Sequence, residues 1–192
     1  MIRFFYALSQ GWQNRKALHR YITQKNLQIN SLSELQFSEL ENLNVAVLVL
    51  DFDGVLAPHN ASEPTATAHA WLKKMSMNIG EQRIAILSNK PKPLRKAYFQ
   101  KHFPGIQWVE SVAKKPYPDG LIEVAYSRGV ATSRLLIVDD RLLTGILASC
   151  LAPCQARYFS QPICQYTRRP IKELFFSILR VTERAVFRWL GR

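Results

Sequence analysis

The sequence predicts an α/β protein, a Rossmann-like three-layer sandwich built around a mostly parallel sheet. From residue 45 onward, short β-branched and apolar runs alternate with segments of helical periodicity, which is typical of a parallel sheet covered by helices. Four of the five aspartates directly follow an apolar run. Open α/β sheets bind ligands at the carboxyl ends of their strands, so this placement predicts a functional site there.

The apolar runs and the helical periodicity set the expected elements. Strands are expected at 45–50, 83–88, 106–109, 134–138 and 156–159. Helices are expected near 65–78, 92–102, 118–129 and 142–150, with a last helix at about 168–190. The acidic, Ser-rich segment 31–44 has no clear pattern. We therefore divide the chain into a basic N-terminal extension (1–30), a core (31–165) and a basic amphipathic C-terminal helix (166–192).

Positive charge is concentrated at the two ends of the 192-residue chain, which has a net charge of +12. Residues 1–30 contain five basic residues and no acid, and residues 166–192 contain seven basic residues and two acids. No apolar run approaches the roughly 20 residues of a membrane-spanning helix. The first ten residues lack the long apolar segment and cleavage site of a secretion signal, although an acid-free start is also typical of organelle transit peptides. Three cysteines with no paired spacing indicate thiols in a reducing compartment.

The four post-strand aspartates are the strongest candidates for a site. Asp51 and Asp53 follow the first expected strand, and Asp139 and Asp140 follow the fourth. Such residues are usually turn or cap residues, but two pairs use nearly the whole aspartate content of the chain. Carboxylates held together raise one another's pKa unless a cation lies between them. An all-oxygen ligand set predicts Mg²⁺.

Three further polar residues fit the binding of a phosphoryl group. Ser88 and Asn89 follow the second expected strand, and Lys115 lies in the loop sequence AKKPYPDG. A metal, a lysine and a hydroxyl together would stabilise the negative charge of a phosphoryl transition state. Each residue alone is more often a turn or solvated residue. Their order along the chain favours a phosphate site.

Four motifs in this order resemble those of haloacid-dehalogenase-type (HAD) hydrolases. VLDFDGVLAPH is similar to the first motif, ILSN to the second, KKPYP to the third and IVDDRLLTG to the fourth. The resemblance implies that Asp51 is a nucleophile forming an aspartyl-phosphate and that Asp53 is the acid/base partner. It further implies that Ser88 and Lys115 bind the phosphate, with Lys114 as a possible substitute for Lys115. Asn89, from its place after the second strand, can also donate to a phosphoryl oxygen. The implied Mg²⁺ ligands are Asp51, Asp53 through its backbone carbonyl, and Asp140, with Asp139 as a possible addition.

The match narrows to the capless, YqeG-type branch (subfamily III), which includes mitochondrial phosphatidylglycerophosphate phosphatases. This resemblance covers about residues 27–190. Only 36 residues separate Asp51 from Ser88 and only 26 separate Ser88 from Lys115, which leaves no room for a cap domain. The fourth motif departs from the family pattern GDRxxTD, because Asp139 stands at its glycine and Gly145 at its final acid. Asp139 can compensate by orienting a metal-bound water.

The expected activity is that of a Mg²⁺-dependent phosphatase acting on phosphatidylglycerophosphate in phospholipid biosynthesis. The expected partner is an anionic phospholipid, contacted peripherally by a basic ridge of Arg180, Arg184, Arg188 and Arg192. The expected location is the cytoplasm, at the inner face of a membrane, or alternatively the mitochondrial matrix. Nucleic acid is not an expected partner, and the sequence leaves the oligomeric state open.

Three other functions stay open on the sequence alone. The first is a soluble HAD phosphatase acting on another ester. The second is a non-enzymatic nucleic-acid-binding module that uses the basic ends and aromatic residues. The third is a degenerate HAD protein, because Gly145 replaces an acid. A receiver-type phosphoacceptor domain fits poorly, because its acidic pair precedes the phosphoacceptor.

Overall fold

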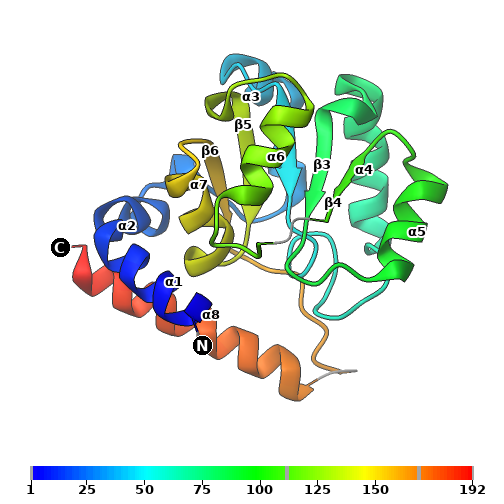
Figure 1. Ribbon diagram of the computed structural model, residues 1–192. Coiled ribbons are helices and arrows are strands. Elements are labelled where there is room, and N and C mark those ends of the chain that lie inside the picture. Colours follow the sequence, from blue (N-terminus) through cyan, green and yellow to red (C-terminus); the bar gives the residue numbers. More distant parts are fainter. Residues whose placement is uncertain (1, 111–112, 168–169, 192) are drawn as a thin grey trace.

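A single six-stranded parallel sheet forms the centre of the protein. The structure is a computed structural model that describes residues 2–110, 113–167 and 170–191. Its strands lie in the order β1-β6-β5-β2-β3-β4, and every pair is parallel (Figure 1). This confirms the predicted fold class. The strands are β1 (Gln28–Ile29), β2 (Val47–Leu50), β3 (Ile84–Leu87), β4 (Gln107–Val109), β5 (Leu135–Asp139) and β6 (Gln155–Phe159).

Helices cover both faces of the sheet, which gives the three layers. Residues of α3, α4 and α5 pack in one hydrophobic cluster, and residues of α2, α6 and α7 pack in the other. Two further helices, α1 and α8, lie side by side across one end of the sandwich (Figure 1). The helices are α1 (Ile2–Gln13), α2 (Arg15–Thr23), α3 (Phe37–Asn42), α4 (Ala66–Ile79), α5 (Pro93–His102), α6 (Asp119–Ser127), α7 (Leu147–Leu151) and α8 (Pro170–Leu190).

The central strands are apolar on both sides because both of their faces are buried. In β2, Leu48 and Leu50 belong to one hydrophobic cluster, and Val47 and Val49 belong to the other. All four side chains are buried, as expected for a strand in the middle of a parallel sheet. The continuous apolar run before Asp51 follows from this position.

The register of the central strands sets where the polar residues lie. Leu50 of β2 pairs with Val138 of β5 and with Ile86 of β3, so the three strands end at one edge of the sheet. The chain between Asp51 and Ser88, all of it described, contains a loop, α4, a 3-10 turn at Glu81–Arg83 and β3. No cap domain is inserted in this stretch, so this edge is not enclosed by one.

Some elements were not predicted. β1 is only two residues long, too short to show a periodicity, and is defined by its pairing with β6. α1 and α2 fold within the segment treated as an extension, and 31–44 contains α3 and a 3-10 turn at Leu32–Glu34. The helix expected at 142–150 begins as a π-helical turn, Leu142–Ile146, and continues as α7. The division at residues 30 and 165 stays a prediction.

The orientation of α8 corrects the expected basic ridge. Arg180 is only 3% exposed, and Arg184 donates to the Tyr158 hydroxyl and to the Ser160 carbonyl, so both point into the protein. Arg188 is exposed, and Arg192 lies outside the described residues. The ridge turns inward because buried acceptors lie under it. The outward face of α8 is apolar instead, with Ile171, Leu174, Phe175, Ile178, Val181 and Trp189 exposed.

None of the described helices combines the length and the hydropathy needed to cross a membrane.

Candidate active site

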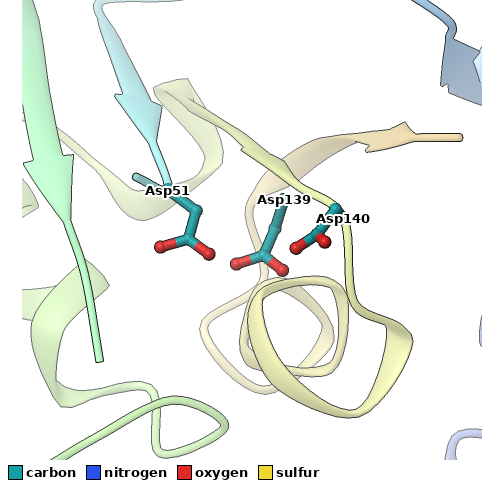
Figure 2. Close-up of side chains that lie close together, drawn as sticks. All are labelled: Asp51, Asp139 and Asp140. Carbon is teal, nitrogen blue, oxygen red and sulfur yellow. The ribbon is translucent and has the colours of Figure 1, made fainter. Parts of the chain in front are cut away.

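Three carboxylates meet at the shared edge of β2 and β5. Asp51 directly follows β2, Asp139 ends β5, and Asp140 follows it. Figure 2 shows their side chains facing a common space. All three are buried, and one ligand oxygen from each lies within 4.8 Å of the others. The Phe52 amide donates to Asp51 Oδ1 at 2.8 Å, which fixes the orientation of that carboxylate.

Lys115 is the cation that lies between two of these acids. Its Nζ is 3.0 Å from Asp51 Oδ1 and 2.6 Å from Asp139 Oδ2, whereas the neighbouring Lys114 is exposed. Burial by itself lowers the pKa of Lys115, but the charges of Asp139 and Asp51 outweigh it and the net shift is upward. The ammonium group is therefore held charged beside Asp51.

Asn89 positions this lysine. Its Oδ1 accepts from the Lys115 backbone amide at 2.7 Å, and its Nδ2 donates to the Lys115 carbonyl at 3.0 Å. A side chain with both of its polar groups engaged fixes the loop before α6. Contact of Asn89 with a phosphate stays a prediction.

Asp53 is not part of the three-carboxylate cluster, although it borders the same small cavity as Asp51, and it pairs with Arg95. Two nitrogens of the buried guanidinium donate to its two oxygens at 2.7 and 3.0 Å, and the Asn60 amide donates at 2.8 Å. Burial raises the pKa of Asp53, but the hydrogen bonds and charge of Arg95 outweigh it and the pKa is lowered overall. The Ser88 hydroxyl, 3.5 Å from the same guanidinium, accepts from the Lys90 amide. Only the backbone carbonyl of Asp53 would be left for a metal.

Asp139 fills the space of the missing motif-four acid. A Cβ added at Gly145 would collide with the Asp139 carboxylate, so the two positions share one volume. Asp139 Oδ1 accepts from the Arg141 amide at 2.9 Å and from the Thr144 hydroxyl at 3.0 Å, and Oδ2 binds Lys115. The exchange of glycine and acid between positions 139 and 145 therefore keeps one carboxylate at this place, supplied from the strand instead of the helix.

Asp140 has one oxygen available for a cation. Oδ2 accepts from Arg180 Nε at 2.7 Å, while Oδ1 is buried and has no hydrogen-bond partner among the described residues. Burial and the neighbouring carboxylates raise the pKa of both Asp51 and Asp140, because each loses stability as an anion. An unpartnered buried oxygen in an all-oxygen cluster fits Mg²⁺.

α8 holds the loops of the site with residues that the sequence analysis missed. Glu173 accepts from the His59 backbone amide at 3.1 Å and bonds its ring nitrogen at 3.2 Å. Glu183 accepts from the Leu142 amide at 3.0 Å and pairs with Arg141. Their sequence signal is two acids and Arg180 at spacings of seven and three, which place them on one helix face.

His59 belongs to the motif LAPH and is enclosed by this contact. Its ring stacks on Phe176 of α8, with centroids 3.8 Å apart. Burial, reinforced by the charge of Arg180, lowers the pKa of His59 to about 4. A neutral, buried imidazole packs α8 against the site.

The space at the carboxylates is small. A cavity of about 70 Å³ is bordered by Asp51, Asp53, Asn89, Asp140, Arg141 and Thr144, among others. That is a few times the roughly 30 Å³ that one water occupies in the liquid. It suits a phosphoryl group better than a whole substrate.

The sequence matches the family described as mitochondrial PGP phosphatase over residues 14–158, well over half of the chain. The chain belongs to this family. It is therefore a phosphatase of the HAD type. α1 and α8 lie on either side of the matched region, since α1 ends at Gln13 and α8 begins at Pro170. No curated protein sequence matches the chain significantly.

Solved structures resemble the protein at low sequence identity. An uncharacterized protein from Corynebacterium glutamicum is 18% identical, with 70% of this chain and 96% of that chain covered and a TM-score of 0.47. A second structure is 12% identical, with 77% and 85% covered and a TM-score of 0.50. A structure assigned as a phosphoglycolate phosphatase from Lactobacillus delbrueckii subsp. bulgaricus is 17% identical, with 58% and 53% covered and a TM-score of 0.40. At such identities the likeness concerns the fold alone.

The shared volume of positions 139 and 145 gives a first prediction. Gly145→Asp should destabilise the protein by at least about 2 kcal/mol because two carboxylates would overlap, and Asp139→Gly should also destabilise it because Lys115 loses its closest acceptor. The double variant should recover about 1–3 kcal/mol relative to the sum of the two, measured by urea unfolding. Gly129→Asp, where an added side chain meets open space but the backbone φ of +62° favours glycine, measures the backbone cost of an acid at a glycine without a steric overlap. Strict additivity of the two changes would contradict the shared volume.

The pairing of Arg180 gives a second prediction. Arg180→Met should cost about 3–5 kcal/mol of unfolding free energy, because it leaves the buried Asp140 carboxylate without its cation. Arg188→Met, on the exposed side of the same helix, should change stability by less than about 0.5 kcal/mol. Denaturant unfolding of both variants checks the difference. Equal effects would show that the ion pair does not hold α8 to the site.

Proposed function

We propose that the protein is a Mg²⁺-dependent phosphomonoester hydrolase that works through an aspartyl-phosphate on Asp51. One observation carries the proposal: the buried Asp51 carboxylate lies beside the charged Lys115 and faces Asp139 and Asp140 at the end of a parallel strand. A nucleophile, a fixed positive charge and a set of cation ligands in one small space match the needs of phosphoryl transfer.

The proposed reaction has two steps at Asp51. In the first, a carboxylate oxygen of Asp51 attacks phosphorus, the bond to the ester oxygen breaks, and Asp53 gives that oxygen a proton. In the second, Asp53 takes a proton from a water that attacks the phosphoryl group, which releases inorganic phosphate and restores Asp51. Lys115 and Ser88 bind phosphoryl oxygens. Across the two steps, one ester and one water are consumed, and one alcohol and one inorganic phosphate are released.

Arg95 supports one half of the proposed role of Asp53. It lowers the Asp53 pKa, so the group is an anion in the free protein, which is the form that accepts a proton from water. For the first step Asp53 must carry a proton. The negative charge of a bound phosphate ester raises the pKa of a nearby carboxyl and favours that protonation.

The proposed Mg²⁺ ligands are Asp51, Asp140 and the backbone carbonyl of Asp53. When bound, the ion would neutralise charge on the phosphoryl oxygens and on the clustered carboxylates. Asp139 has a supporting part, because its two oxygens already bind Lys115, Thr144 and the Arg141 amide. It keeps the lysine directed at Asp51.

As the substrate we propose phosphatidylglycerophosphate, reached at the surface of a membrane that contains anionic lipid. The family description supports this substrate, and the edge of the sheet without an inserted cap supports a phosphate attached to something large. Two neighbouring helices also expose apolar side chains, which are Ile2, Phe4, Phe5, Leu8 and Trp12 on α1 and Ile171, Leu174, Phe175, Ile178 and Trp189 on α8. Such a surface suits insertion among lipid headgroups. The family description also favours the mitochondrial matrix face over a bacterial-type inner membrane face.

The catalytic proposal predicts that Asp51→Asn lowers kcat by more than about a thousandfold, ~4 kcal/mol in the barrier, because the amide cannot form the acyl-phosphate. Phosphate release is measured with an aryl phosphate and with phosphatidylglycerophosphate, nucleotides, sugar phosphates and phosphopeptides. In the same assay, Mg²⁺ should support activity, Ca²⁺ should support it poorly, and chelator should abolish it.

The control for this experiment is Asp119→Asn, an exposed aspartate at the start of α6. It should keep wild-type turnover. If Asp51→Asn kept more than about a tenth of wild-type kcat, the barrier would have risen by less than about 1.4 kcal/mol, and the assignment of Asp51 as the nucleophile would be wrong. Full activity in chelator would remove the metal from the mechanism.

The membrane proposal predicts binding to vesicles that contain anionic phospholipid. Ile178→Glu and Trp189→Glu should each weaken binding about tenfold or more, because a charge replaces an apolar side chain at the lipid contact. Met77→Glu on α4, a residue that is 80% exposed on another part of the molecule, should not weaken it. Co-sedimentation measures all three, and added salt should weaken binding through screening. If the protein does not bind anionic vesicles and strongly prefers a soluble ester, the lipid substrate is wrong and the phosphatase activity stands.

A further inference from the structure

An apolar groove runs between α1 and α8 and has no part in the mechanism proposed above. Its volume is about 520 Å³. Side chains from both helices line it, chiefly Phe4, Ala7, Leu8, Leu179, Val186 and Leu190. Both helices lie outside the family match at 14–158, so two walls of the groove come from segments that the family match does not cover.

The groove and the candidate active site share walls. Arg141 and Thr144 border both the groove and the small cavity at Asp51. Lys115, whose Nζ is 3.0 Å from Asp51, also lines the groove. The groove therefore adjoins the space at Asp51, with Arg141 and Thr144 as their shared wall.

The two spaces differ in size and can therefore hold different parts of a phosphate ester. The cavity at Asp51, about 70 Å³, has room for a phosphoryl group, whereas the groove is several times larger. The alcohol part of an ester must lie outside the small cavity. The adjoining groove is the apolar space that borders it.

The charges at the junction favour a neutral, apolar occupant. Arg141 already pairs with Glu183, and the Glu183 carboxylate also accepts from the amides of Leu142 and Leu143. These charges are satisfied within the protein. Arg3 of the lining is exposed near the start of α1, and the rest of the walls are mainly hydrocarbon. A polar group held deep among the hydrocarbon walls would lose its water without gaining partners.

Gly11 lets α1 pack closely against residues beside the groove. It lies on α1, and a Cβ at this position would come within 2.6 Å of Leu143 and 3.2 Å of Phe187. The absence of a side chain lets α1 approach Leu143 and Phe187 closely. Side chains of the two helices form facing walls of the groove.

We propose that this groove binds one hydrocarbon chain of the phosphate ester whose phosphate is at Asp51. The proposal rests on the proposed phosphatase activity. It names a substrate with a long linear apolar tail that is held by the protein, in a groove whose lining residues Phe4 and Leu8 also belong to the exposed apolar side of α1. Chain length then contributes to binding of the ester, and it does so without any membrane.

The test uses n-alkyl phosphates from ethyl to decyl, with the full-length protein, Mg²⁺ and no vesicles, below the concentration at which each ester forms micelles. Burying a methylene contributes ~0.8 kcal/mol, so KM should fall about fourfold per added methylene until the groove is filled. The contribution is equal in ground and transition states, so kcat should stay nearly constant. A KM independent of chain length would overturn the proposal.

Two variants test whether the dependence of KM on chain length arises in the groove. Ala7→Trp fills it, and Val186→Trp narrows it from a half-exposed position where a larger side chain endangers folding less. Both should flatten the dependence of KM on chain length. Ala185→Trp, on the exposed neighbour that does not line the groove, should keep it. Thermal unfolding identifies any variant that fails to fold. A dependence that survives in a folded Ala7→Trp or Val186→Trp protein would overturn the proposal.

Two further measurements separate this proposal from others. Calorimetric binding of n-alkyl phosphonates, which cannot be hydrolysed, repeats the series without turnover. Suppose that the protein hydrolyses no ester, but that its affinity for phosphonates rises with chain length and that Ala7→Trp removes this rise. The groove proposal would then stand, and the proposed activity would be wrong. A dimer in sedimentation that dissociates in Ala7→Trp would identify the occupant as a second copy of the chain and overturn the hydrocarbon assignment.

Discussion

The fold depends on the neutralisation of four buried carboxylates at the ends of two adjacent strands. Their mutual repulsion and the loss of water would oppose folding if each acid stood alone. A cation from a different part of the chain offsets each one, and so the charges of the site also connect its segments. The pairs are Asp53 with Arg95 of α5, Asp51 and Asp139 with Lys115 before α6, and Asp140 with Arg180 of α8. The same groups that would perform catalysis therefore hold three separate segments of the chain to the edge of the sheet.

The need to neutralise these carboxylates also explains which side of α8 faces the protein. Its polar side chains Glu173, Arg180 and Glu183 are buried against the site, so they cannot serve as its solvated face. The apolar residues of the helix that do not pack on the sandwich are then left outside. A helix whose charges point inward and whose apolar side points outward is the reverse of an ordinary surface helix. The exposed apolar side of α8 is the surface on which the proposed lipid contact rests.

The sequence was sufficient for the parts of the structure that have a local signal. The apolar strand before Asp51 has both faces buried, and its composition shows this directly. The directions of side chains after the strands were harder to predict, because they depend on distant partners. Arg180 was predicted to lie on an outward ridge, since its spacing with Arg184 and Arg188 says nothing of the acid 40 residues earlier that turns it inward. β1 was missed because two residues become a strand only through pairing with β6.

The departure at the fourth motif shows how a local exchange can preserve a site. A glycine at position 145 and an acid at position 139 would suggest a lost ligand if each position were read alone. In three dimensions the Asp139 carboxylate occupies the place where a side chain at 145 would begin. It binds Lys115 at 2.6 Å there, so the charge that faces the phosphate position is retained while its attachment to the backbone changes. Loss of the motif-four acid is therefore no argument for a degenerate enzyme in this chain, because the volume and the charge at that place are both kept.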